Sequence, residues 1–466
     1  MKIVIVGGVA GGASAAARAR RLDESAEIVL IERGAEPSFA NCGMPYYIGG
    51  EIERREKLLV APIDLLRDRL RLDVRVRQEA ISIDRAGKSL RVRRLDDGSE
   101  YEEAYDKLIL SPGAAPTLPS IDGIDSPRIH TLRNLADADG LRDAATGAAS
   151  AIVVGGGFIG LEMMENLVRL GVRTTLVERN RQVVPPWDAE MVVTLAETIR
   201  DHGVDLRLGD EVTAFTTTDD GLTATLRSGT QLHADFAVMA IGVRPENKLA
   251  ADAGLPIGER GGIVVNEQMQ TSDLNIYAVG DAVETTHALT GDPTQIPLAG
   301  PANRQGRIAA DAIFGRHTSY RGSQGTAVLR VFDKTAAMTG LSEKACQANG
   351  HHYEKVYVHP SNHAGYYPGA EPMALKLLFD PQTGSIFGAQ AVGGDGVDKR
   401  IDVLATAIQA EMTVFDLEEA ELCYAPQYGS AKDLVNLAGF VAAGVARGDQ
   451  PVAHAEELLD GTADVV

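Results

Sequence analysis

The chain of 466 residues is 44% hydrophobic and 24% charged, which is typical of a folded protein and excludes a disordered, collagenous or coiled-coil chain. Its 65 acidic and 45 basic residues leave a net charge of −20, which disfavours nucleic acid and anionic membranes as partners. No uncharged stretch reaches the ~20 residues of a membrane-spanning helix, and three scattered cysteines suit a reducing cytoplasm. At ~150 residues per domain we expect about three domains.

Two copies of one pattern occupy the first half of the chain. Residues 3–6 are a β-branched run, followed by a glycine-rich turn, a helix-forming stretch over 13–22 and a second apolar run over 28–31. The same strand, turn, helix and strand recur over 152–177. This repetition predicts an α/β fold with two doubly wound dinucleotide-binding domains.

Both glycine-rich turns resemble the fingerprint that binds a dinucleotide. The first, 7–12, has Val9 at the position of the middle glycine, whereas the second, 155–160, matches fully. An acid follows each turn at 18 to 20 residues, Glu32 in the first copy and Glu178 in the second, where a carboxylate accepts ribose hydroxyls. A pyrophosphate would then lie at the N-terminus of the helix that follows. A purely structural glycine turn is the alternative.

The pattern of apolar residues changes after about residue 326. The alternating apolar residues over 373–379 predict a half-buried antiparallel strand, and the spacing from Ile401 to Met412 predicts a helix. We therefore expect a third, α+β domain, and the prolines over 112–127 indicate a linker between the first two. The predicted boundaries are 1–115 with 246–325 for the first domain, 116–245 for the second, 326–447 for the third and 448–466 for a tail.

Cys42 is a candidate nucleophile. Ser38 or Asn41 could cap a helix that Pro45 begins, and a thiol beside a helix N-terminus is favoured as the thiolate. Position 47 is a tyrosine, so Cys42 has no local cysteine with which to close a disulfide. Its oxidised form would be a mixed disulfide with a small thiol or a sulfenic acid. A buried, inert cysteine is the alternative.

A polar and basic stripe lies on the first predicted helix. Ser14, Arg18 and Arg21 are spaced i, i+4 and i+7, so they share one face, where a core-facing stripe would be apolar. Arginines suit the phosphates of a ligand, and a chain of charge −20 needs a local basic patch to bind one. A solvated surface is the alternative.

The histidines between 351 and 363 do not predict a metal site. Pro360 breaks any helical His-x-x-x-His spacing, and no cysteine stands at ligand distance in the sequence. We therefore assign no metal.

Five further motifs stand out along the chain: 38–49, 271–273 with 277–281, 298–306, 365–369, and 424–426 with 432–433. Together they resemble the single-cysteine branch of the pyridine nucleotide-disulfide oxidoreductases, especially coenzyme A-disulfide reductases. The resemblance covers nearly the whole chain and implies a homodimer with active sites shared between subunits. It implies FAD on the first domain, NADH or NADPH on the second, and dimerisation through the third.

The same resemblance implies roles for individual residues. Cys42 is the catalytic thiol: its thiolate attacks the substrate disulfide and holds one half as a mixed disulfide. Tyr366 and Tyr424 reach in from the partner subunit as hydrogen-bond donors or acids to the departing thiolate, with loop packing as the alternative. Asp281 bonds the ribitol chain, and Ala299 lies near the pyrimidine side of the flavin. The full predicted cofactor set is Gly7, Val9, Ala10, Gly12, Glu32, Arg33, Gly113, Asp281, Ala299, Gly155, Gly157, Phe158, Ile159, Gly160, Glu178 and Gly242; the substrate set is Ser14, Arg18, Arg21, Ser38, Asn41, Asn303, Arg304 and Lys432.

The implied activity is reduction of coenzyme A disulfide, or of coenzyme A persulfide or polysulfide, by a reduced nicotinamide. The runner-up is an NADH oxidase or peroxidase that uses a cysteine sulfenic acid. Peroxidase-like relatives carry a histidine in the first glycine loop where this chain has Ala10, which counts against peroxide. A non-catalytic flavin- or nucleotide-binding sensor is the alternative of another class. The stretch 451–466 resembles the linker and opening strand of a rhodanese domain.

Overall fold

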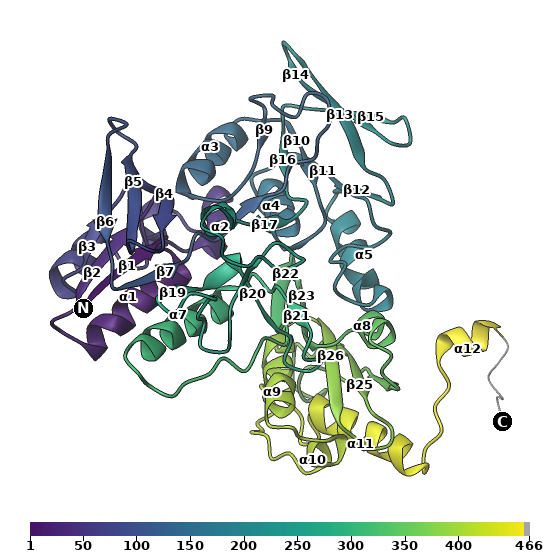
Figure 1. The fold of residues 1–466 in the computed structure, drawn as a ribbon. Helices are drawn as coiled ribbons and strands as arrows, with labels where there is room; N and C mark the ends of the chain where they lie inside the picture. The colour runs from purple at the N-terminus through teal and green to yellow at the C-terminus, as the bar shows by residue number, and fades with distance from the viewer. Residues whose placement is uncertain (461–466) are drawn as a thin grey trace. The chain divides into compact units, whose positions relative to one another are not determined.

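A computed structural model describes residues 1–460 of the chain. These residues fold into two compact units (Figure 1). Unit 1 contains Met1–Arg179 and Asp210–Ser323, and unit 2 contains Asn180–Gly209 and the chain from Gln324 onward. The chain therefore passes between the units after residues 179, 209 and 323.

Unit 1 begins with the first predicted strand, helix and strand. β1 (Lys2–Val6) and β2 (Glu27–Ile31) pair in parallel and are joined by α1 (Ala10–Leu22). The helix begins three residues before the predicted start, because Ala10 to Gly12 already form its first turn. The parallel sheet has the order β19-β7-β1-β2-β3, with β3 at Asp73–Arg75, β7 at Lys107–Leu110 and β19 at Ile276–Ala278.

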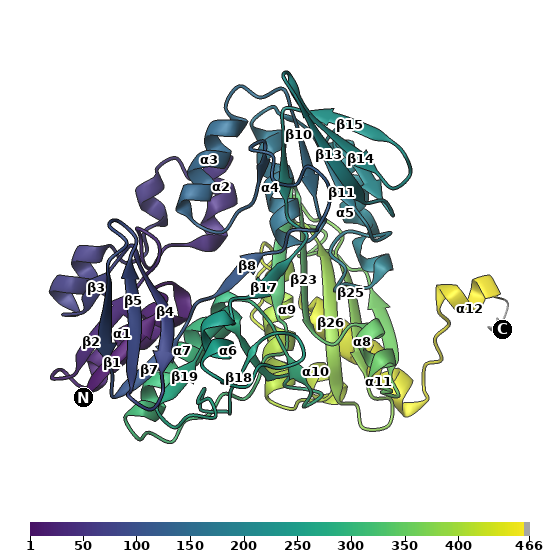
Figure 2. The same cartoon turned by 45° about the horizontal axis from the view of Figure 1, so that its top comes forward.

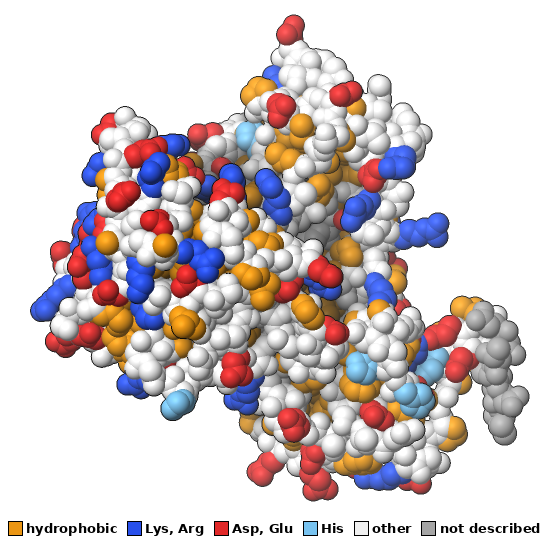
Figure 3. Space-filling model, viewed as in Figure 1, with side chains coloured by type: hydrophobic (Ala, Val, Ile, Leu, Met, Phe, Trp, Pro, Cys, Tyr) orange, Lys and Arg blue, Asp and Glu red, His pale blue; other side chains and the backbone are white. Residues whose placement is uncertain are grey.

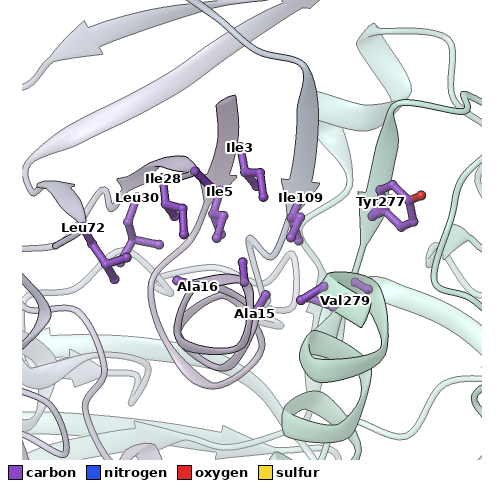
Figure 4. Packing of buried hydrophobic residues seen from close by; sticks show 14 of the residues in the cluster. Ile3, Ile5, Ala15, Ala16, Ile28, Leu30, Leu72, Ile109, Tyr277 and Val279 are labelled. Carbon is purple, nitrogen blue, oxygen red and sulfur yellow. The ribbon is translucent and has the colours of Figure 1, made fainter. Parts of the chain in front are cut away.

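Small side chains let α1 pack closely against this sheet. Ala15 and Ala16 are fully buried against the inward-facing Ile3, Ile5 and Ile28 (Figure 4). Val4 and Val6 belong to the buried cluster on the other face of the sheet, so the β-branched run predicted as a strand is buried on both faces, and burying each aliphatic side chain contributes roughly 1.5–3 kcal/mol.

A second helix of unit 1, α7 (Ala299–Ile313), packs against α1. Gly306 is required at their contact, because a Cβ there would lie 2.2 Å from the carbonyl oxygen of Gly11. The two helices therefore approach backbone to backbone, which places residues of α7 beside the first glycine loop.

The second predicted copy forms another parallel sheet in unit 1. β10 (Ser150–Val154) pairs with β11 (Arg173–Glu178), and α4 (Phe158–Arg169) joins them. The predicted linker contributes β8 (Ala114–Pro116), which pairs antiparallel with β17 (Val243–Pro245), so the connection runs as two strands (Figure 2). Further elements are β9 (Ile129–His130), α3 (Leu135–Ala145) and β16 (Phe236–Met239), with the small sheets β4 (Gln78–Asp84), β5 (Ser89–Arg94), β6 (Glu100–Ala104) and β13 (Val212–Thr218), β14 (Gly221–Leu226), β15 (Gln231–Ala234).

Unit 2 is built on the predicted antiparallel sheet, in the order β22-β23-β26-β25-β24. The strands are β22 (Ala327–Val331), β23 (Lys334–Gly340), β24 (Glu354–Val358), β25 (Ala374–Phe379) and β26 (Ile386–Gly393). The helices are α5 (Val193–Asp201), α8 (Glu343–Ala348), α9 (Val397–Gln409), α10 (Val414–Glu418), α11 (Leu434–Arg447) and α12 (Ala455–Asp460).

Two details of the predictions for unit 2 are wrong. β25 is not half-buried: both of its faces are covered, and even Lys376 is 0% exposed because three carboxylates surround its ammonium group. The predicted helix ends at Gln409, and Met412 lies in the turn after it, where Glu411 adopts a φ of 56°. In the tail, α12 occupies Ala455–Asp460, and the remainder of the predicted rhodanese-like strand lies outside the described residues.

The surface of unit 1 carries charges of both signs. On the face drawn in Figure 3, acidic and basic side chains are interspersed over this unit instead of forming a patch of one sign. None of the helices within residues 1–460 combines the length and apolar character needed to cross a membrane.

Candidate functional site

The first glycine loop has a backbone that only glycine can supply. Gly7 has a φ of +93°, and a Cβ there would lie 2.0 Å from the carbonyl oxygen of Ser111. A Cβ at Gly12 would lie 1.9 Å from the carbonyl oxygen of Gly7. Glu32 reaches the loop from the end of β2, and its carboxylate accepts a 2.7 Å hydrogen bond from the Gly8 N–H. This hydrogen bond fixes the carboxylate of Glu32 against the first glycine loop.

The second glycine loop repeats this geometry. Gly155 has a φ of +111°, and a Cβ at Gly160 would lie 1.8 Å from the Gly155 carbonyl oxygen. Glu178, 6% exposed at the end of β11, accepts a 2.7 Å hydrogen bond from the Gly156 N–H. Gly157 precedes α4, whose first two residues are the predicted Phe158 and Ile159.

These two loops fit the two dinucleotides that FAD and NAD(P)H carry. At each loop a helix N-terminus follows a turn whose first and last glycines, Gly7 and Gly12 or Gly155 and Gly160, leave no room for a Cβ, the arrangement that accepts a pyrophosphate. Val9 and Ala10, at the start of α1, tolerate side chains because their backbone is not in the left-handed region. The Val9 departure from the fingerprint therefore leaves the loop geometry intact.

The other predicted cofactor residues lie in unit 1 around these loops. Asp281 follows β19, and burial raises the pKa of its carboxyl group. Ala299 is the first residue of α7, and Arg33 lies 3.5 Å from carboxylate oxygens of both Glu79 and Glu246. Gly113 and Gly242, with φ of +74° and +119°, each leave open space where a side chain would stand.

Cys42 lies in a short turn, Asn41–Gly43, that leads directly into α2 (Met44–Ile48). The predicted caps are wrong. Gly43 precedes the helix, Ser38 has a φ of 50° with its backbone bonded to Gly8 and Val60, and the Asn41 amide points to the Arg133 carbonyl at 3.4 Å. Neither side chain caps α2, because Ser38 lies before the turn, Asn41 is the first residue of the turn, and Gly43 directly precedes the helix.

The expected acidity of the thiol is also not found. Although Cys42 is exposed, partial desolvation raises the pKa of its thiol above the ordinary value, and the negative charges of Glu162 and Asp281 raise it further. Because α2 has only five residues, its dipole is small against these effects. Cys42 is therefore an accessible thiol whose ionisation its acidic neighbours oppose.

Glu162 is a site residue that the sequence analysis missed. It lies on α4, where burial and the neighbouring Glu165 raise the pKa of its carboxyl group to about 7, against the effect of a hydrogen bond from Tyr46. The signal was present in the sequence as an acid in the otherwise apolar first turns of the second nucleotide-binding helix.

The two predicted tyrosines meet in unit 2. The hydroxyl oxygens of Tyr366 and Tyr424 lie 2.6 Å apart, although 58 residues separate them in sequence, and the side chains are exposed. This hydrogen bond is the main cause that raises the pKa of Tyr366. The pair therefore offers two coupled hydroxyl groups at the surface of the unit.

A buried arginine holds the two tyrosine-bearing loops together. Arg400, 2% exposed, donates to the Asn362 carbonyl at 2.7 Å on the Tyr366 side and to the Asp433 carboxylate at 2.9 Å on the Tyr424 side. Asp433 also caps α11, so the adjacent, exposed Lys432 is held at a fixed helix end.

The predicted basic stripe is brought to the contact of α1 and α7, but one of its charges is already paired. Arg18 lies 2.6 Å from the carboxylate of the buried Asp311. Ser14 donates to Asn303 at 2.5 Å. Arg21 and Arg304 are exposed and have no carboxylate partner within the part of the chain that the structure describes. These two are the charges available to a ligand phosphate.

One acidic cluster in unit 2 has the spacing of a metal site. Carboxylate oxygens of Asp188, Glu190 and Glu343 lie within 4.8 Å of one another. The ammonium group of Lys376 stands among them, at 2.9, 2.6 and 2.5 Å. The lysine takes the position that a cation would need, so the cluster is an ion-pair network.

Comparison with known proteins agrees with this geometry. Residues 1–306 match the family model of pyridine nucleotide-disulphide oxidoreductases, and residues 326–433 match the dimerisation domain of the same family. A coenzyme A disulfide reductase from Staphylococcus haemolyticus is 36% identical over 444 residues, which are 95% of this chain and 99% of that protein.

Solved structures are also similar over most of the chain. Reduced Bacillus anthracis CoADR-RHD shares 48% identity with a TM-score of 0.97, over 98% of this chain and 83% of that one. An NAD-dependent persulfide reductase from A. fulgidus shares 38% with a TM-score of 0.93, over 96% and 84%. The water-forming NADH oxidase from Lactobacillus brevis shares 30% with a TM-score of 0.92, over 97% and 100%.

The predicted fold class, with two dinucleotide-binding domains and an α+β domain, is confirmed, and so is the predicted resemblance. The family models span more than half of the chain, and relatives above 30% identity match it almost from end to end. The chain therefore belongs to the pyridine nucleotide-disulphide oxidoreductase family and is an FAD-dependent oxidoreductase that uses NAD(P)H.

Proposed function

We propose that the protein reduces coenzyme A disulfide, or coenzyme A persulfide or polysulfide, with Cys42 as its redox-active thiol. The observation that carries this proposal is the pair of exposed hydroxyl groups of Tyr366 and Tyr424, 2.6 Å apart. Cleavage of a disulfide by a thiolate releases a second thiolate, which a hydroxyl pair can protonate. Reduction of oxygen to water or peroxide also consumes protons, so the comparison of substrates below, and not the pair alone, separates the two activities.

The residues assign the steps of the reaction as follows. The Cys42 thiolate attacks one substrate sulfur, so a Cys42–substrate S–S bond forms while the substrate S–S bond breaks. The departing thiolate takes a proton from the tyrosine pair. When bound, FAD supplies the relay of two electrons from the nicotinamide that later releases the second thiol from Cys42. The sum is one disulfide, one NAD(P)H and one proton converted into two thiols and NAD(P)⁺.

We further propose that the working enzyme is a homodimer in which the tyrosines serve the partner's Cys42. Unit 2 exposes large aromatic side chains, Tyr366 at 76% and Tyr428 at 68%, within the residues that match the family's dimerisation model. A second copy would cover such a surface. We also propose the predicted domain boundaries, 1–115 with 246–325, 116–245, 326–447 and 448–466. A cytoplasmic location suits the three free cysteines.

The tyrosine pair gives a direct prediction. Tyr366→Phe and Tyr424→Phe should each lower kcat with coenzyme A disulfide about tenfold to a hundredfold, since each removes one hydroxyl from the proton path. The double variant should have a lower kcat than either single variant. Its loss should nevertheless be smaller than the product of the two single losses, because the two hydroxyl groups act as one unit. Steady-state kinetics measure this, and Tyr428→Phe, at a tyrosine that is also exposed (68%), is the matched control. Full turnover in the double variant would contradict the role.

The basic stripe predicts which substrates are used. Arg21→Ala should raise KM for coenzyme A disulfide about tenfold, the effect of one charge-assisted contact, and leave KM for polysulfide unchanged. Arg18→Ala is a poorer probe because it also strips Asp311 of its partner. Exposed Arg91, on β5, gives the control Arg91→Ala.

The same rates should be compared with coenzyme A persulfide, polysulfide, peroxide and oxygen. If oxygen or peroxide is reduced fast, coenzyme A compounds are reduced slowly and Arg21→Ala does not change the kinetic constants, the protein is an oxidase or peroxidase and this proposal is wrong. Binding of FAD and NADH with none of these acceptors reduced would favour a sensor.

For the nicotinamide we expect a modest preference for NADH. The buried carboxylate of Glu178, bonded to the second glycine loop, repels a 2′-phosphate at the ribose. Arg179 and Arg181 weaken this repulsion, because their positive charges can neutralise the Glu178 carboxylate. We expect kcat/KM to be about tenfold higher with NADH than with NADPH. Glu178→Gln should bring the two values of kcat/KM closer together. A clear preference for NADPH in the wild type would show that the arginines dominate.

A further inference from the structure

We propose that Arg400 is a positioning residue that holds the hydroxyl groups of Tyr366 and Tyr424 at the distance at which they act as one proton donor. The inference rests on the proposed role of this pair and deepens it. The tyrosines lie on two stretches without helix or strand, the Tyr366 loop (362–371) and the Tyr424 segment (419–433). Two exposed hydroxyl groups that lie 2.6 Å apart on such stretches need a support from the interior.

The Arg400 guanidinium is buried at the base of both stretches. It projects from α9 and makes a two-pronged contact with Asp433, from Nε to Oδ1 at 3.3 Å and from Nη2 to Oδ2 at 2.9 Å. Nη2 also donates to the Asn362 carbonyl at 2.7 Å, and Nη1 donates to the Gly396 carbonyl at 3.0 Å. One planar, charged group therefore bonds the start of the Tyr366 loop and the end of the Tyr424 segment at once.

Asn362 transmits this support to the Tyr366 loop. Its N–H donates to the Glu371 carbonyl at 2.9 Å, and its side-chain oxygen accepts from the Glu371 N–H at 3.0 Å. These two bonds close the loop at its base, where Asn362 is buried, while Tyr366 is exposed. We therefore expect a shift of Asn362 to move the Tyr366 hydroxyl with the rest of the loop.

The Tyr424 segment is fixed from the same point. Ala364, in the Tyr366 loop, donates its N–H to the Gly429 carbonyl of the Tyr424 segment at 2.9 Å. Gly429 is buried beside Arg400, since a Cβ there would lie 3.7 Å from Nη2. The guanidinium thus lies directly beneath the hydrogen bond that joins the two stretches.

Arg400→Lys is the first test, because it keeps a charge for the buried Asp433 but loses the planar fork that also reaches Asn362. The kcat with coenzyme A disulfide should fall about tenfold to a hundredfold, the effect of displacing a reacting group by about 1 Å. The KM should not change. Lys432 is held by the α11 cap, which Asp433 forms with the Val435 N–H and not with Arg400.

A combined variant separates positioning from a general loss of stability. If Arg400 acts through the hydroxyl pair, adding Arg400→Lys to the Tyr366→Phe, Tyr424→Phe double variant should change kcat by less than about twofold. Arg447→Lys is the matched control. It makes the same substitution at another two-pronged contact of unit 2, with Glu418 at 3.0 and 2.6 Å, and should leave kcat unchanged.

A second measurement reads the pair without turnover. A fluorinated tyrosine replaces Tyr366 in FAD-loaded protein, and its phenol is titrated by fluorine NMR. The hydrogen bond to Tyr424 raises the pKa of the Tyr366 phenol. Arg400→Lys should therefore lower this pKa to the value that the Tyr424→Phe variant shows.

Asp433→Asn provides the same tests if Arg400→Lys protein does not fold. It keeps an oxygen for the Val435 N–H and removes the charge that binds Arg400, so kcat and the phenol pKa should fall in the same direction by less. Wild-type kcat in the folded variants, a further loss in the double tyrosine background, or an unchanged phenol pKa would each overturn the inference. A lowered phenol pKa, in a protein whose wild type reduces no disulfide, would support the inference and refute the proposed function.

Discussion

Cys42→Ser is expected to abolish reduction of every disulfide substrate while the protein stays yellow with bound FAD. A serine hydroxyl cannot form the mixed disulfide or accept electrons at sulfur. FAD binding should persist because the groups that fit the dinucleotide, the glycine loop of 7–12 and Glu32, do not include Cys42. Turnover should therefore fall to the limit of detection, measured as NAD(P)H consumption with coenzyme A disulfide.

The other two cysteines provide matched controls. Cys346 is 0% exposed, and burial, with Asp188 and Glu343, raises the pKa of its thiol to about 12, so it offers no thiolate at neutral pH. Cys423 is exposed but belongs to unit 2. Cys346→Ser and Cys423→Ser should both keep disulfide reduction. Retained turnover in Cys42→Ser would show that Cys42 is an inert structural residue.

Lys376→Met is expected to cost about 3–5 kcal/mol of stability, the effect of removing one partner from a buried ion pair. Lys376 is 0% exposed, and its ammonium lies 2.9 Å from the carboxylate of Asp188, which is itself 3% exposed. Methionine fills the volume but leaves that carboxylate in the interior with no cation. The melting temperature of the unit 2 transition should fall roughly 10 °C.

The control for this prediction is Lys344→Met, since Lys344 is exposed on the neighbouring α8 and its loss should change the melting temperature little. Equal melting temperatures for Lys376→Met and the wild type would contradict the argument.

The same network predicts an acid limit to stability. Burial alone would raise the pKa of Glu343, but hydrogen bonds from Lys376, Lys355 and Tyr353 outweigh it and lower the pKa to about 2. The unfolded value is about 4.3. The contribution of Glu343 is therefore fully present above about pH 4.5 and is lost as pH falls towards 2.

Local patterns in the sequence predicted what depends on local geometry. The glycines at 7–12 and 155–160 indicated two loops, because a Cβ at the first or last glycine of each loop would lie within 2.3 Å of a backbone oxygen. The strands and helices around them followed from periodicity. The predicted caps at Ser38 and Asn41 were wrong because a single turn, which begins at Asn41 and ends at Gly43, precedes α2, and propensity does not resolve a boundary of three residues.

What depends on distant pairing was beyond the sequence. The alternating pattern places Lys376 on the polar face of a half-buried strand. No neighbouring residue in the sequence indicates that Asp188, Glu190 and Glu343 surround it. Likewise, the family resemblance named Tyr366 and Tyr424, but the bond between their hydroxyl groups arises from loops that Arg400 joins. The sequence predicted a raised acidity for Cys42, but the pKa of its thiol is raised, because its acidic neighbours come from α4 and from the turn after β19.

The route of the chain through the two units limits how the protein can be cut. Asn180–Gly209 belongs to unit 2 and is fixed there by Asp188, which receives N–H bonds from Glu343 and Gln390 as well as the Lys376 ammonium. A gene truncated after residue 323 would keep this segment and remove every one of those partners. The fragment 1–323 should therefore be prone to aggregation.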